Sequence, residues 1–226
     1  MFRLAFAVLI LASMAACTYR GGGDEPGVRK FTYFSMLNGD DIRDKCKTVP
    51  GYERYRVVYN GLHEEQVRIY ELVRGPRDGH IVKASVSGPA NVAEIDLKDL
   101  LSPWRPSVSE RYLKDAQFKT LTDSLAEAGL FKGAPRGLDL PSDAFWWLAV
   151  GCKEGNVYFS AWRHPQPDLA TLSFVKPLLA EDATNVRFNP PRHPISHMPQ
   201  QMTMKNDPRF MLKVGENGLT GVSNLF

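Results

Sequence analysis

Histidine and methionine side chains gather near the C-terminal end of this sequence, in a pattern that could bind a soft metal ion. They are His193, His197, Met198, Met202 and Met204. Thioether sulfur selects Cu(I), and imidazole binds several transition metals. Pro194 and Pro199 interrupt the helix on which the two histidines would share a face. We therefore favour the alternative, a proline-rich segment whose methionines pack against a core or a partner.

Catalytic motifs were sought around the five histidines of the chain. A hydrolase needs a nucleophile, a base and a group that orients the base. Neither Gly-x-Ser-x-Gly nor His-Glu-x-x-His occurs in the sequence. His80 or His164 could meet a serine or an aspartate in the folded chain, but a surface or hydrogen-bonded histidine is the favoured interpretation. An unrecognised hydrolase site stays open as an alternative, and no cofactor is predicted.

The first 17 residues resemble the export and lipidation signal of bacterial lipoproteins. Arg3 precedes an apolar run from Leu4 to Ala12, which is too short to span a bilayer as a stable helix. Residues 11–17 then read LASMAAC, which resembles the lipobox, with Met14 where the family usually has Leu. The alternatives are an ordinary signal peptide cut after Ala16 and a buried N-terminal helix.

This resemblance implies that residues 1–16 are removed and that Cys17 carries acyl chains. Each buried methylene of an acyl chain contributes about 0.8 kcal/mol to membrane binding. Because Thr18 and not aspartate follows the cysteine, the sorting rule of lipoproteins implies the outer membrane, on its periplasmic side. Residues 17–30 are expected to form a lipidated N-terminus and a flexible glycine-rich tether.

The two other cysteines, Cys46 and Cys152, are predicted to form a disulfide. An exported chain folds in an oxidising compartment, where an even number of cysteines favours pairing. Closing a loop of roughly 100 residues stabilises a fold by about 4–5 kcal/mol in the chain-entropy model. The alternative is a pair of buried free thiols.

Two groups of residues are candidates for an interaction surface. Trp146 and Trp147 are consecutive in a predicted strand, so they point to opposite faces and cannot share one core. We predict that one of them meets a ligand or a partner. Arg54, Arg56 and Arg68 could line the solvent face of a hairpin and bind a glycan or an acidic partner, although a solvated polar face is the favoured interpretation.

Alternating side chains, together with a run over 145–152 that is apolar on both faces, predict the elements that must position these residues. Strands are expected over 52–59, 65–73, 81–86, 145–152 and 157–162, with a tight turn at Asn60-Gly61. The spacing of Ser107 and Glu110 predicts the start of a helix, and leucines at helical spacing predict another over 169–179. The order predicts an α+β fold, an antiparallel sheet of two hairpin or meander units with two helical segments on one face.

The chain is therefore expected to have one α+β domain over 31–188 and an extended Pro/Met-rich tail over 189–226. A net charge of +3, with basic and acidic residues interleaved, excludes an obvious nucleic-acid surface. The sequence predicts a non-catalytic, lipid-anchored envelope protein that binds or supports a partner protein or another envelope component. Periplasmic Cu(I) binding through the tail is the alternative.

Overall fold

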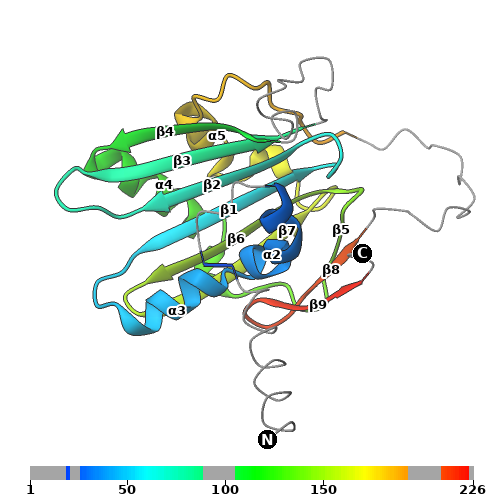
Figure 1. Ribbon diagram of the computed structural model, residues 1–226, viewed down its shortest axis with the longest axis horizontal. Coiled ribbons are helices and arrows are strands. Elements are labelled where there is room, and N and C mark those ends of the chain that lie inside the picture. Colours follow the sequence, from blue (N-terminus) through cyan, green and yellow to red (C-terminus); the bar gives the residue numbers. More distant parts are fainter. Residues whose placement is uncertain (1–18, 21–25, 89–104, 193–209, 224–226) are drawn as a thin grey trace, which may run out of the picture.

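The computed structural model describes residues 19–20, 26–88, 105–192 and 210–223, and it shows the predicted mixed α+β fold (Figure 1). Its centre is an antiparallel sheet of six strands in the order β4-β3-β2-β1-β6-β7. These strands are β1 (Arg54–Gly61), β2 (Val67–Val73), β3 (His80–Ser87), β4 (Ser107–Leu113), β6 (Phe145–Lys153) and β7 (Asn156–Arg163). All five strands expected from the sequence are present in this sheet.

The first face of the sheet is covered by the helices that helical spacing predicts. They are α4 (Asp115–Glu127), the short 3-10 helices η2 (Leu130–Lys132) and η3 (Leu169–Thr171), and α5 (Val175–Glu181). Leu121 and Leu125 of α4 and Leu178 of α5 pack with tyrosines of β1 and β2 and with Trp147 in one buried cluster. Burial of this apolar surface fixes both helices on the sheet.

The second face carries a layer that the sequence did not predict. It contains α2 (Pro26–Asn38), α3 (Asp40–Thr48) and a three-stranded sheet in the order β5-β8-β9, formed by Asp139–Pro141, Met211–Val214 and Leu219–Ser223. A second buried cluster joins Leu37 and Ile42 to Trp146, and Leu212 to the same core. The sheet therefore lies between two separate cores.

Two expected boundaries are wrong. The flexible tether was placed over 17–30, but α2 begins at Pro26. The tail was placed over 189–226, but residues 211–223 form β8 and β9, and Leu140 of β5 pairs with Leu212. The two predicted helical segments do lie on one face, and α2 and α3 cover the other face in addition.

The capping-box pattern at Ser107 and Glu110 does not begin a helix. Residues 107–113 instead form β4, an edge strand that pairs along its whole length with β3. The helix begins eight residues later than Ser107, where the Lys114 backbone N–H donates to Gln117 Oε1 at 3.0 Å. The spacing was a chance match within a strand.

The expected turn at Asn60-Gly61 is also displaced. Both residues belong to β1, and the chain reverses over Leu62–Gln66, with Leu62 at a φ of 61°. The Asn60 side chain donates to the carbonyls of Ser142 and Ala144, so it ties β1 to the segment before β6. This contact explains why Asn60 is buried in a strand instead of exposed in a turn.

One half of the second face has no cover within the described part of the chain. The α2–α3 layer lies over β1, β6 and β7 and its core reaches Val67 and Ile69 of β2, whereas the rest of β2, β3 and β4 extend beyond it (Figure 1). We call this half the open face, and its side chains from β2 to β4 form three rows. The rows are Val73-Ile81-Tyr112, Glu71-Lys83-Glu110 and Ile69-Ser85-Val108. Tyr112 is 75% exposed and Val108 is 46% exposed.

Candidate functional site beneath Tyr19

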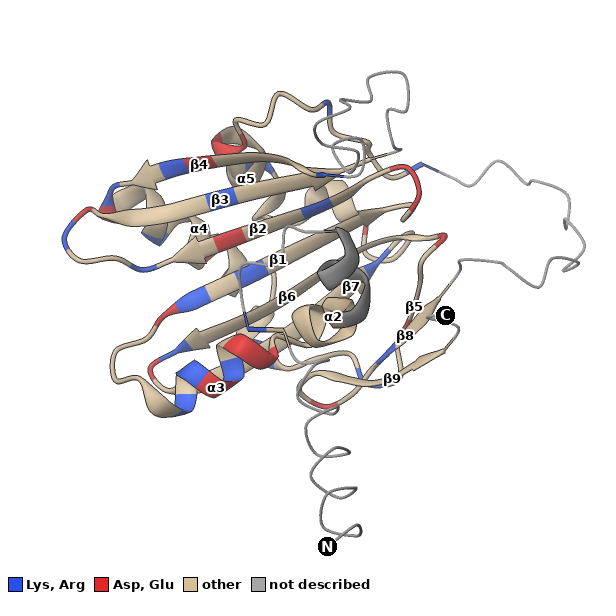
Figure 2. Cartoon of the chain, viewed as in Figure 1, with Lys and Arg blue, Asp and Glu red and all other residues tan. Residues whose placement is uncertain are grey.

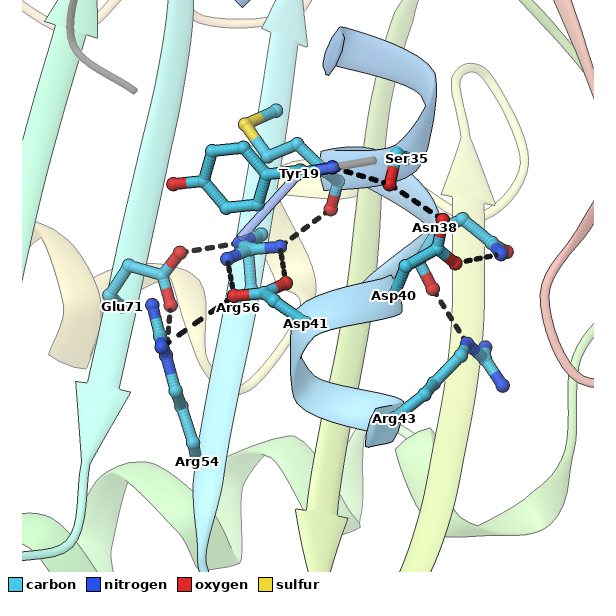
Figure 3. Close-up of polar contacts among 10 residues, drawn as sticks. Tyr19, Ser35, Asn38, Asp40, Asp41, Arg43, Arg54, Arg56 and Glu71 are labelled. Atoms are coloured by element: carbon cyan, nitrogen blue, oxygen red, sulfur yellow. Dashed lines mark hydrogen bonds and ion pairs between the residues drawn. The ribbon is translucent and has the colours of Figure 1, made fainter. Parts of the chain in front are cut away.

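A fully buried arginine lies at the boundary between the α2–α3 layer and the open face. Arg56 points from β1 toward the start of α3, where its Nη1 and Nη2 donate to both carboxylate oxygens of Asp41 at 2.8 and 2.9 Å. Nη1 also donates to the carbonyl of Met36 at 2.7 Å, and Nε donates to Glu71. The guanidinium thus joins α2, α3, β1 and β2 at one point (Figure 3).

A second arginine balances the charge of this cluster. Arg54, two residues before Arg56 on the same face of β1, donates from Nε to Glu71 at 2.8 Å and lies 3.6 Å from Asp41. The two carboxylates hold the pKa of Arg56 above its ordinary value despite burial, which alone would lower it. Two basic and two acidic side chains therefore lie together in a site with little access to water.

Tyr19 lies on top of this charged cluster. Its ring covers the guanidinium of Arg56, with 4.8 Å between the Arg56 Cζ and the ring centroid. Its backbone N–H donates to Ser35 Oγ at 2.9 Å, and the Ser35 hydroxyl donates in turn to Asp40 at 2.6 Å. Burial raises the pKa of the Tyr19 hydroxyl. We call these residues the Tyr19 site: Tyr19, Ser35, Asp41, Arg54, Arg56 and Glu71.

The corner between α2 and α3 places Asp41 over the arginines. Gly39 occupies this corner with a φ of 71°, and a Cβ there would lie 2.7 Å from Val150. Glycine is therefore required both by the backbone conformation and by the close approach to β6. Arg43 supports the corner by donating to the carbonyls of Asn38 and Asn217 at 2.8 and 2.7 Å.

The predicted disulfide fastens the same layer to the sheet. Cys46 of α3 and Cys152 of β6 are bonded, and 106 positions of sequence separate them. Both sulfurs lie in the second core, beside Ile42 and Val150. The N-terminal layer is therefore held by a covalent bond at one end of α3 and by Arg56 at the other.

No family model, curated protein or solved structure matches this chain. Its function is accordingly inferred from its own residues. Within the described ranges, no helix is long and apolar enough to cross a membrane. The same ranges contain no group of three or more histidine, cysteine or acidic side chains arranged to hold a metal ion.

The interaction surface predicted from the arginines is wrong. Arg56 and Arg68 are both completely buried, and they lie on opposite faces of the sheet. Arg54 is the most accessible of the three, with 16% of its side chain exposed. Their donors are used inside the fold, so these residues cannot serve as a solvent-exposed surface for a glycan or an acidic partner.

The tryptophan surface is also wrong, although the argument about opposite faces is correct. Trp146 and Trp147 both have an exposed fraction of 0%, because each face of β6 has its own core. The Trp146 indole donates to the carbonyl of Pro141 at 2.8 Å. Trp147 packs against Tyr59 and Phe174, with ring centroids 4.6 and 5.3 Å away. Neither residue is available to a partner.

Arg68 holds a different segment, which we call the strap and which comprises residues 182–192. Arg68 donates to Asp182 at 2.6 Å and to the carbonyl of Val186, and Tyr70 donates to the same carboxylate at 2.8 Å. The strap is also held where Tyr59 donates to the carbonyl of Asn189 at 2.6 Å. Side chains of the sheet thus replace the backbone pairing that this irregular segment lacks.

The two histidines considered for catalysis, His80 and His164, contact side chains that hold the fold together. His80 pairs with Asp115 at the start of α4, accepts a hydrogen bond from the Gly75 N–H at 3.1 Å, and stacks on Phe118. His164 packs edge-on against Phe145. A Ser-x-x-Lys spacing also occurs at Ser173 and Lys176, but the Ser173 hydroxyl donates to the carbonyl of Ser124 at 2.8 Å.

Several predicted residues lie outside the described ranges. They are Cys17 and the proposed metal ligands His193, His197, Met198, Met202 and Met204. Lipidation and Cu(I) binding therefore stay predictions. Tyr19 and Glu71, by contrast, are site residues that the sequence did not indicate, whereas the paired acids Asp40 and Asp41 were predicted to lie at a turn or helix start, which is where α3 begins. The one available signal was the alternation that places Arg54 and Arg56 on the same face of β1.

Proposed function

We propose that this chain is an exported, lipid-anchored protein of the bacterial envelope, facing the periplasm from the outer membrane. Its α+β domain acts without catalysis, by binding or supporting a partner protein or another envelope component. The observation that carries this proposal is the Tyr19 site. It fixes the folded domain to the chain two positions after Cys17, the residue that the lipobox resemblance assigns to lipidation.

The disulfide supports the proposal that the chain is exported to an oxidising compartment. Such bonds form and persist in secreted and periplasmic proteins, whereas cytosolic thiols are kept reduced. Cys46 and Cys152 are buried in the core instead of being placed near a reactive group, which fits a structural bond. A chain stabilised by this bond is more stable when it folds outside the cytosol, where the bond persists.

The open face supports a binding role. Two charged side chains of the open face, Lys83 and Glu110, lie between the apolar pair Ile81–Tyr112 on one side and Val108 on the other. Tyr112 and Val108 are two of the few large apolar side chains that are exposed within the described residues. Apolar groups bordered by charge are typical of surfaces that bind a protein partner.

Intact-mass analysis of the protein expressed in a bacterial host tests the anchor. We expect loss of residues 1–16 and a mass increase that corresponds to acyl chains on Cys17. Cys17→Ala should abolish the increase and release the protein from the membrane fraction, while Cys46 and Cys152 stay bonded. An unmodified Cys17 in the mature wild-type protein, or retention of residues 1–16, would contradict the proposal.

Crosslinking in the native envelope, followed by mass spectrometry, tests the binding role. We expect crosslinks from the open face to one envelope component, and Tyr112→Ala should reduce them several-fold. Lys119→Ala is the matched control, because Lys119 is equally exposed but lies in α4 on the first face. Equal crosslinking of the two variants would contradict binding through the open face.

A further inference from the structure

The first described residues leave no room for a long tether between the domain and a lipid at Cys17. Thr18 alone separates Cys17 from Tyr19. A fully extended chain rises at most about 3.6 Å per residue, so the two Cα atoms lie within about 7 Å of each other. That distance is shorter than the diameter of a helix. A lipid on Cys17 would therefore emerge beside the Tyr19 site.

Tyr19 is also held against rotation. The Ser35 hydroxyl accepts from its backbone N–H, while the Arg56 guanidinium lies under its ring. These contacts come from α2 and β1 and act in different directions, as Figure 3 shows. Arg56 is itself fixed by both oxygens of Asp41 and by Glu71. The chain therefore leaves the domain at one point and from the second face of the sheet.

We infer that the α2–α3 side of the domain is held against the surface of the bilayer, with Tyr19 as a fixed point of attachment. This inference rests on the proposed lipidation of Cys17. It replaces the flexible tether expected over residues 17–30 by a connection of one residue. The α2–α3 side contacts a lipid surface with anionic headgroups.

The exposed charges of Arg20 and of α3 fit this orientation. Arg20 is exposed directly after Tyr19, and Lys45 and Lys47 are exposed on α3, where Asp44 is the one exposed acid (Figure 2). The excess of positive charge favours anionic headgroups, and it acts within about 10 Å at physiological salt. The bond from Cys46, between the two lysines in sequence, keeps this part of α3 fixed on the sheet.

The orientation also determines which elements point away from the membrane. Helices α4 and α5 lie on the first face, on the far side of the sheet from Tyr19 (Figure 1). Lys119 of α4 is an exposed lysine, as Lys47 is. If charge alone attracted the domain to the membrane, either lysine would contact the lipid. Attachment through Tyr19 instead brings Lys47, and not Lys119, to the lipid surface.

Site-specific photocrosslinking to lipid tests the inference. A benzophenone amino acid replaces Lys47 or Lys119 in the full-length lipidated protein, reconstituted in vesicles of phosphatidylglycerol and phosphatidylethanolamine. We expect at least a fivefold excess of lipid adducts at position 47. The double variant Tyr19→Ala/Ser35→Ala should bring the ratio close to one, and Tyr19→Phe should preserve it.

The outcomes separate this inference from the proposed function. Equal adducts at positions 47 and 119 in a protein whose mass shows acylated Cys17 would overturn the fixed orientation and leave the anchor intact. An unchanged ratio in the double variant, with its fold verified by circular dichroism, would also overturn it. A protein whose mass shows no acyl chain would instead contradict the proposed function.

Discussion

Arg56 and Arg68 perform the same task on opposite faces of one sheet, yet with different partners. Each is completely buried on a central strand and fixes a segment that does not belong to the sheet. Arg56 is shared between two carboxylates and holds the corner of α2 and α3. Arg68 has one carboxylate, Asp182, and holds the strap through that side chain and the Val186 carbonyl.

The difference shows how the two faces are stabilised. The strap is fixed by one buried ion pair, Arg68–Asp182, by an exposed ion pair between Arg192 and Glu65, and by neutral hydrogen bonds such as the one from Tyr59 to Asn189. The α2–α3 layer is fixed at two points, the Arg56 cluster and the disulfide. Removing a single group should therefore affect the second face more strongly than the first. The following predictions test this ranking, from the largest expected effect to the smallest.

Removal of the disulfide by Cys46→Ala/Cys152→Ala should cost about 4–5 kcal/mol of unfolding free energy, because a loop of roughly 100 residues is released. Urea unfolding measures the loss. The wild-type protein in excess reductant should unfold at the same urea concentration as the double variant. A loss below about 1 kcal/mol would mean that Arg56 alone holds the layer.

Arg56→Ala should destabilise the fold by about 3–5 kcal/mol, because it leaves Asp41 and Glu71 buried without their shared cation. Thermal and urea unfolding measure this effect. Lys119→Ala is the control, since it removes an exposed pair with Asp123 worth about 0.3–0.5 kcal/mol. If the two variants were equally stable, the central role assigned to Arg56 would be wrong.

Asp182→Asn should destabilise the fold by about 1.5–3 kcal/mol near neutral pH, the usual range for a hydrogen bond to a charged group. Burial raises the pKa of Asp182, but hydrogen bonds from Thr184 and Tyr70 and the charge of Arg68 outweigh it and lower the pKa. Because the folded state favours the carboxylate, its contribution is present above the ordinary pKa of about 3.9 and disappears as the pH falls through the lowered value.

The stability difference between wild type and Asp182→Asn should therefore shrink as the pH falls from about 5 to about 2. Urea unfolding across this range measures the difference. A constant difference would show that the Asp182 charge does not hold the strap, and the contrast between the two arginines would lose its electrostatic basis.

Tyr19→Ala should have the smallest effect, about 0.5–1 kcal/mol, the usual strength of a cation–π contact at a partly accessible site. Tyr19→Phe should remain within a few tenths of the wild type, since it keeps the ring over Arg56. Hydrogen exchange at the Tyr19 amide, which donates to Ser35, should accelerate in the alanine variant only. Equal exchange in both variants would argue against the role of the ring.

The sequence predicted the strands that have a clear apolar pattern, and it missed those that do not. Alternation located β1, β2 and β3, a run that is apolar on both faces located β6, and the turn after that run located β7. Strand β4 lies at the edge of the sheet and is exposed on both faces except at Leu113, so it has no such pattern. Strand β8 has only four residues, too few to be distinguished from a tail.

The Tyr19 site could not be predicted because it depends on pairing and on an unpredicted layer. A two-residue turn at Asn60-Gly61 would have placed Arg56 opposite Glu65, whereas the true register places it opposite Glu71. Alternation correctly placed Arg54 and Arg56 on one face, but a polar face is normally assigned to solvent. Only the position of α3, which brings Asp41 over that face, makes burial of Arg56 possible.

The C-terminal hairpin of β8 and β9 has a consequence for the order of assembly. The Leu219 backbone N–H donates to Asn38 Oδ1 across 181 positions of sequence, and Leu212 completes the core under α2 and α3. Contacts between such distant residues close slowly, because a long loop must be ordered before they form. The half of the protein that is made first is therefore the half that finishes folding last, and until then it presents its apolar side to chaperones.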